Sequence, residues 1–132
     1  MFGNRKKHSS RIDSLIGAGT RIEGDVIFTG GLRIDGEVKG DVRSAEDNAA
    51  TLVVSAQARI EGEVHVSHCV INGSVTGTVH VAENLELQRG AQVTGDVHYA
   101  NLEMHQGAVV QGRLVHHSEA ARGAALKLAS SN

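Results

Sequence analysis

"IDGEVKGDV", residues 34–42, places a branched apolar residue at every fourth position, Ile34, Val38 and Val42, with a glycine midway between each pair. Charged residues fill the other positions. Glycine weakens the interior of a β-strand, because it packs no side chain and loses more conformational entropy on folding than other residues. Its regular placement among strong strand formers therefore indicates a backbone that needs glycine at one repeated point.

The same unit, apolar-x-Gly-x-apolar, recurs along the chain. Six copies are IEGDV (22–26), VKGDV (38–42), IEGEV (60–64), VTGTV (75–79), VTGDV (93–97) and VQGRL (110–114). Their glycines, at positions 24, 40, 62, 77, 95 and 112, are separated by 16, 22, 15, 18 and 17 residues. A repeat of this length with period-two alternation is typical of a solenoid made of short strands. We therefore predict an all-β parallel β-helix of about six coils over residues 14–116.

Aligning the copies on this glycine gives four columns, which we expect to stack about 4.8 Å apart in successive coils. Eight residues before the glycine stand Ile16, Leu32, Val54, Cys69, Leu87 and Met104. Four before it stand the small residues Thr20, Gly36, Ala58, Gly73, Ala91 and Ala108. Two before it stand Ile22, Val38, Ile60, Val75, Val93 and Val110, and two after it stand Val26, Val42, Val64, Val79, Val97 and Leu114. The apolar columns should form the core, and the glycines should lie where the strand bends and the coils approach closely.

Two features of the repeat need a separate explanation. Hairpins of an antiparallel protein would place glycine at loop tips, as Asn-Gly or Asp-Gly, whereas here it lies inside the alternation. The long step from Gly40 to Gly62 contains SAEDNAA (44–50), which we interpret as a loop inserted at a corner. Residues 1–13 and 117–132 fall outside the repeat, and we expect the first to be disordered and the second to be disordered or a short frayed helix.

The composition excludes several classes of protein. The 132 residues suit one domain, and a net charge of -2 argues against a nucleic-acid binder. The single cysteine, Cys69, excludes an internal disulfide and suits a reducing compartment. No apolar run approaches the roughly 20 residues that span a bilayer, and no apolar stretch of signal-peptide length follows the N-terminus. The sequence also lacks a Gly-x-x-x-x-Gly-Lys phosphate loop. We expect a cytoplasmic protein without a cofactor.

The coils with the IDGEVKGDV and GEV signatures, flanked by short polar tails, resemble the bactofilins, which are bacterial polymer-forming cytoskeletal proteins. The resemblance covers about 100 of the 132 residues. It implies a right-handed β-helix with a triangular section that assembles end to end into nonpolar filaments without nucleotide. It also implies attachment to the inner face of the cytoplasmic membrane, and a scaffold for cell-shape proteins and for enzymes of cell-wall synthesis or hydrolysis.

Elementary physics also favours polymerisation. Each end of a β-helix exposes unpaired strand edges and a slice of apolar core, and such edges pair with another chain unless charge, proline or a covering element blocks them. This chain has no proline, and its end coils carry Ile27 and Val115 where middle coils carry Arg43, His65, His80 and His98. The alternative is that these are ordinary exposed apolar residues. We expect the end-to-end contacts at Leu15, Ile16, Ile22, Val26 and Phe28 on one end coil, and at Leu102, Met104, Val110 and Leu114 on the other.

The N-terminal leader MFGNRKK combines an apolar tip with basic residues. It resembles the membrane-targeting peptide of the bactofilins, which implies lipid contacts by Met1, Phe2, Arg5, Lys6 and Lys7. Basic residues are attracted to anionic lipid, and a buried aromatic ring adds apolar contact. The alternative is a solvated basic tail, while a role in binding nucleic acid would leave the apolar tip without a function.

The residues that most invite a chemical role also have simpler explanations. His65, His80 and His98 share one outward column, where neighbouring imidazoles are able in principle to share zinc. We interpret them as solvated surface, because the sequence offers no fourth ligand or pocket. Cys69 falls in an inward column and should be a core residue.

The carboxylates Asp25, Asp41, Glu63 and Asp96 should form an exposed column without a cleft for acid–base catalysis. The alternative function is a hexapeptide-repeat enzyme of the acyltransferase or carbonic anhydrase type. The steps of 15 to 22 residues between the glycines do not keep the six-residue period of a hexapeptide repeat.

Overall fold

Short strands alternate with tight corners along the whole repeat region. The computed structural model describes residues 12–45 and 50–116, and within them three strand segments make up each coil, with β9 and β11 each contributing a segment to two coils. The first two coils contain β1 (Ser14–Ile16), β2 (Arg21–Glu23), β3 (Val26–Phe28), β4 (Gly31–Ile34), β5 (Glu37–Lys39) and β6 (Val42–Ser44). The middle coils contain β7 (Thr51–Val54), β8 (Arg59–Glu61), β9 (Val64–Ile71), β10 (Ser74–Thr76) and β11 (Val79–Leu87). The last two are completed by β12 (Gln92–Thr94), β13 (Val97–Tyr99), β14 (Asn101–Met104), β15 (Val109–Gln111) and β16 (Leu114–His116).

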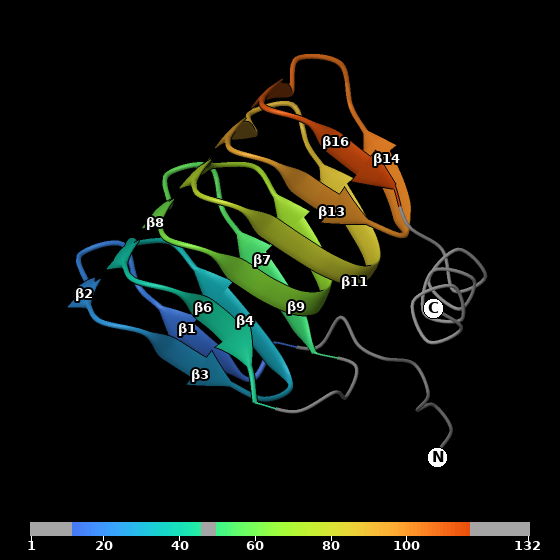
Figure 1. Cartoon of the computed structure of the whole chain (residues 1–132). Helices are drawn as coiled ribbons and strands as arrows, with labels where there is room; N and C mark the ends of the chain where they lie inside the picture. Colours follow the sequence, from blue (N-terminus) through green and yellow to red (C-terminus); the bar gives the residue numbers. More distant parts are fainter. Residues whose placement is uncertain (1–11, 46–49, 117–132) are drawn as a thin grey trace, which may run out of the picture.

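Every strand pair in these sheets is parallel, and equivalent strands of successive coils lie side by side (Figure 1). One sheet contains six strands in the order β15-β12-β10-β8-β5-β2. The ten-stranded sheet covers the rest of each coil, because β9 and β11 each pass through one corner without a break. The predicted all-β parallel solenoid of about six coils is therefore confirmed.

Three of the four predicted columns are confirmed by the register. Val38 pairs with Ile22 and Ile60, and Val79 pairs with Val64 and Val97. The small column is joined by backbone hydrogen bonds across the same corner in successive coils. Seven residues that the sequence places in the apolar columns of the third to fifth coils are at most 1% exposed: Val54, Ile60, Val64, Val79, Leu87, Val93 and Val97.

The column placed eight residues before the glycine was wrong in two coils. Ile34 and Ile71, rather than Leu32 and Cys69, stack in register with Val54. The corner after these strands is two residues shorter in the second and fourth coils. Counting eight residues back from the glycine therefore reaches a residue two positions before the true member of the column. Leu32 and Cys69 lie in a neighbouring inward column, where both are buried. The shift of two preserves the face that each side chain points to.

The repeated glycine is explained by both its backbone angle and its surroundings. Gly62 and Gly95 have φ values of 156° and 141°, a region that L-residues with side chains rarely adopt. A Cβ on Gly62 would also fall on the carbonyl oxygen of Gly40, and a Cβ on Gly95 on that of Gly77. The coils thus approach backbone to backbone along the glycine column, which answers why glycine recurs among strong strand formers.

The long step of the repeat falls between β6 and β7, as the inserted loop requires. This is the corner that β9 and β11 pass without interruption. Residues 46–49 of the insertion lie outside the described residues, as do the leader residues Met1, Phe2, Arg5, Lys6 and Lys7 and the tail at 117–132.

Candidate functional site

The two end coils carry the exposed apolar surface of the described residues. Large apolar side chains that are exposed there lie in the first coil, the last coil or just before the first: Ile12, Leu15, Ile27, Met104, Val109 and Leu114. A solenoid covers each coil with the next, so its two ends are the only coils with one open side. The exposed apolar side chains therefore lie at the two ends of the stack.

The C-terminal coil is an open slice through the core. In the coil before it, Leu87 and Val97 are fully buried, whereas their register partners Met104 and Leu114 are 42% and 44% exposed. Leu102 and Val110, also predicted as contact residues, are half-buried against the core. These side chains occupy core positions and lack only a further coil to cover them.

The N-terminal coil exposes a different set of side chains. Ile16 and Phe28 are 9% and 8% exposed and pack as core residues, while Ile22 and Val26 are half-buried. The exposed surface comes instead from two outward positions, with Leu15 at 60% and Ile27 at 58%. Leu15 was predicted as a contact residue from its place in the first coil.

Two outward columns have polar or charged residues in the inner coils and an apolar residue in one or both end coils. Ile27 is the register partner of Arg43, and Val115 is the partner of His98. Val109 was not among the predicted contact residues, although its column is Arg59, Ser74 and Gln92 in the coils before it. Val109 is thus an apolar residue at the end of a polar column, as Ile27 and Val115 are, and the same comparison of aligned repeats predicts it.

Both end coils also present strand edges. In the described residues, β1, β2 and β3 pair only with β4, β5 and β6, and β14, β15 and β16 pair only with β11, β12 and β13. Inside the stack, each coil uses the same strand edges to pair with the next coil, whereas in the end coils the outer edges have no described strand beside them. An edge of this kind is a template for pairing with another chain.

The carboxylate column has a structural role that the sequence did not predict. Asp25 Oδ1 accepts a hydrogen bond of 2.9 Å from the backbone N–H of Asp41, and Asp41 Oδ1 accepts one of 3.0 Å from Glu63. Asp96 Oδ1 likewise accepts one of 3.1 Å from Arg113. Each of these three aspartates therefore caps the equivalent residue of the next coil. This explains the aspartate that follows several of the repeated glycines.

One of these caps gives a pH-dependent prediction. The backbone hydrogen bond from Arg113, helped by its guanidinium and opposed by desolvation, lowers the pKa of Asp96 below its ordinary value. A lowered pKa stabilises the fold above the unfolded pKa of about 3.9, and this contribution is lost as the pH falls through the folded pKa. We expect Asp96→Asn to reduce the urea midpoint modestly at pH 7, with the difference from wild type shrinking once the pH falls below about 4 and lost below the lowered folded pKa. Equal differences at pH 7 and pH 3 would contradict this assignment.

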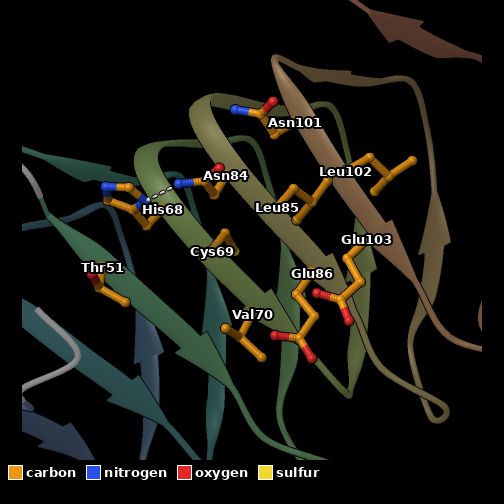
Figure 2. A pocket seen from close by; sticks show the side chains of 10 residues that line it. All are labelled: Thr51, His68, Cys69, Val70, Asn84, Leu85, Glu86, Asn101, Leu102 and Glu103. Atoms are coloured by element: carbon orange, nitrogen blue, oxygen red, sulfur yellow. Dashed lines mark hydrogen bonds between the residues drawn. The ribbon is translucent and has the colours of Figure 1, made fainter.

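A hollow of about 380 Å³ lies across β7, β9, β11 and β14 (Figure 2). On its wall the Asn84 amide lies 3.1 Å from Nδ1 of His68. Cys69 is buried and was correctly predicted as a core residue, and burial raises the pKa of its thiol. A buried thiol with a raised pKa is a poor nucleophile. His68 and Cys69 are also consecutive in one strand, so their side chains point to opposite faces and form no catalytic pair.

The comparisons with known proteins agree with this architecture. The family model described as "Bactofilin: Polymer-forming cytoskeletal" matches residues 14–115. Bactofilin BacP of Myxococcus xanthus (strain DK1622) is 26% identical over 107 residues, 80% of this chain and 43% of BacP. Bactofilin BacO of the same strain is 26% identical over 102 residues, 77% of this chain and 78% of BacO. The match thus spans less than half the length of BacP. No solved structure matched the chain.

A search of the described residues for membrane-spanning segments found no helix with the length and apolarity needed to cross a bilayer.

Proposed function

Because this chain belongs to the bactofilin family of polymer-forming cytoskeletal proteins, we propose that it polymerises end to end through its two end coils without nucleotide. We further propose that the polymer lies on the inner face of the cytoplasmic membrane and organises cell-shape or cell-wall proteins there. The family is structural, so the chain is a cytoskeletal polymer and not an enzyme.

One observation carries the proposed mode of assembly, namely the position of the exposed apolar side chains. They gather on the two coils that also present unpaired strand edges. A further coil placed on the C-terminal coil would cover Met104 and Leu114, which occupy core positions. It would also continue the hydrogen-bond ladders that already join successive coils. Apolar burial and strand pairing thus favour the same contact.

The absence of a nucleotide requirement follows from what holds the coils together. The stack within the chain consists of parallel strand ladders and apolar columns, and an end-to-end contact of the same kind needs no phosphate-dependent switch. The sequence has no Gly-x-x-x-x-Gly-Lys phosphate loop. Polymerisation should therefore proceed equally with and without added nucleotide.

Membrane attachment is proposed from the leader sequence. Arg5, Lys6 and Lys7 would each contribute about 1 kcal/mol on anionic lipid. Burial of the Phe2 ring would add about 2 kcal/mol. A single leader would bind weakly after the cost of ordering it. A filament that presents many leaders to one surface would bind with high avidity.

The membrane proposal predicts a separation of two properties. Phe2→Glu, or deletion of residues 1–7, should leave the filaments intact in electron micrographs but release them from anionic liposomes in a co-sedimentation assay. A triple variant with Arg5, Lys6 and Lys7 replaced by Gln serves as the matched control for charge. Its residual binding should no longer decrease with added salt, because screening acts on the basic residues. Equal pelleting of wild type and the deletion variant would rule out attachment through the leader.

A further inference from the structure

Three histidines form a contiguous ladder on the outer surface of the middle coils. His65 in β9, His80 in β11 and His98 in β13 are register partners, with Val64 and Val66 pointing inward on either side of His65. The ring centroids of His65 and His80 are 4.4 Å apart, with an angle of 11° between the planes. Those of His80 and His98 are 4.6 Å apart at 10°. The parallel strands therefore hold neighbouring imidazoles in contact.

A carboxylate joins this ladder at one end. Oε1 of Glu63 lies 2.9 Å from Nε2 of His65. One ligand atom from each of Glu63, His65 and His80 can be chosen so that all three lie within 4.8 Å of one another. The Glu63 and His65 side chains are about half exposed, so an ion in solution can reach them. The sequence predicts a solvated column here, because it offers no fourth ligand or pocket, and the structure adds the contact between Glu63 Oε1 and His65.

We propose that Glu63, His65 and His80 bind a divalent transition-metal ion of the zinc type. Two imidazoles and one carboxylate form a donor set that zinc uses in proteins, with a fourth, tetrahedral position left to water. Tetrahedral coordination at the usual bond lengths places ligand atoms about 3.3 Å apart. The Glu63–His65 pair is already closer than this, and the third ligand must approach by at most about 1.5 Å.

The required movement involves side chains alone. Stacked, parallel rings direct their nitrogen lone pairs side by side, so His65 and His80 must tilt toward each other to share an ion. Rotation about the side-chain bonds of His65 and of the half-buried His80 achieves this, while the parallel ladder keeps their backbones about 4.8 Å apart.

Some of the surrounding charges favour cation binding at this site and one opposes it. The carboxylates of Asp41 and Asp96 lie in the flanking column and favour a cation, whereas Arg43, the register partner of His65, opposes one. Glu63 itself supplies the charge nearest to the ion. In the polymer, every subunit would carry one such site.

A second cluster in the structure provides a matched control. Glu86, Glu103 and His105 also place ligand atoms within 4.8 Å of one another, in the two coils at the C-terminal end. It has one histidine and two carboxylates, a set that suits zinc less well than a histidine pair. His105→Gln removes its only imidazole. His98→Gln tests the far end of the ladder.

The experiment titrates untagged full-length protein with Zn²⁺ in competition with a chromophoric chelator. Wild-type protein should compete with the chelator and bind about one Zn²⁺ ion per chain. His80→Gln and Glu63→Gln should each lower the association constant at least about tenfold, since loss of even an outer-shell partner has roughly that effect. His105→Gln and His98→Gln should bind as wild type does. Circular dichroism and filament formation check that each variant folds.

Three results would overturn the assignment. Wild-type protein that fails to compete with the chelator has no such site. Unchanged affinity in His80→Gln, with binding lost in His105→Gln, would place the ion at the second cluster. A loss in His98→Gln as large as in His80→Gln would place it between those two rings, away from Glu63.

Discussion

Val79→Asp should destroy the cooperative fold of the chain. Val79 is fully buried at the centre of the stack, in register with Val64 on one side and Val97 on the other. A carboxylate at this position would have no partner in an apolar column, and an uncompensated buried charge costs about 3–5 kcal/mol. Domains are typically stable by only about 5–15 kcal/mol. We therefore expect a large fall in soluble protein and in the urea midpoint measured by far-ultraviolet circular dichroism.

The neighbouring residue provides the control for this substitution. His80→Asp introduces the same carboxylate one position along the same strand, on the outward face. Its urea midpoint should fall much less than that of Val79→Asp, because the carboxylate stays in contact with water and only the ring stacking with His65 and His98 is lost. A Val79→Asp protein that melts like His80→Asp would contradict the assignment of the inward columns.

Leu114→Arg should reduce filaments to small oligomers while the β-rich spectrum persists. Leu114 occupies a core column but is 44% exposed, because no further coil of the described part of the chain covers it. An arginine there is solvated in the monomer and becomes a buried charge in the contact. A penalty of about 3–5 kcal/mol would weaken the contact by roughly a hundredfold to several thousandfold. Ile22→Arg at the other end should act in the same way, since Ile22 stands in the inward column of Val38 and is only half-buried in the first coil.

The products of these two variants also determine the polarity of the filament. If like ends meet, each variant should stop at a dimer joined through its intact end. If unlike ends meet, each should stop at the monomer. Light scattering distinguishes the two, and Thr76→Arg, an exposed change in the middle of the stack, is the control that should still form filaments. Filaments of wild-type length from both end-coil variants would exclude the end coils as the contact.

Much of the fold could be predicted because a solenoid repeats one local rule. Alternation identified which faces are buried, and the glycine identified one corner in every coil. The register failed at Leu32 and Cys69, because corners that differ by two residues preserve the alternation and leave no signal in the pattern. Such a shift is visible only when the strand ladders are known.

The sequence predicts those parts of the end surface that depend only on the order of the coils. Met104 and Leu114 are exposed because the last coil of the described residues has no further described coil beside it, and this follows from counting the repeats. By contrast, Ile16 and Phe28 were expected to share in the end surface, yet both pack almost completely into the core. Their side-chain burial depends on packing that an alternation pattern does not describe. The carboxylate caps were also missed, because a hydrogen bond to the next coil requires knowledge of the register.

X-ray diffraction from oriented, nucleotide-free filaments tests the end-to-end arrangement most directly. Strands within the stack run across the solenoid axis and are about 4.8 Å apart along it. If subunits join through their end coils, the solenoid axis lies along the filament, and the reflection near 4.8 Å should appear on the meridian. If subunits join side by side, the same reflection should appear on the equator, and the proposed assembly through the end coils would be wrong.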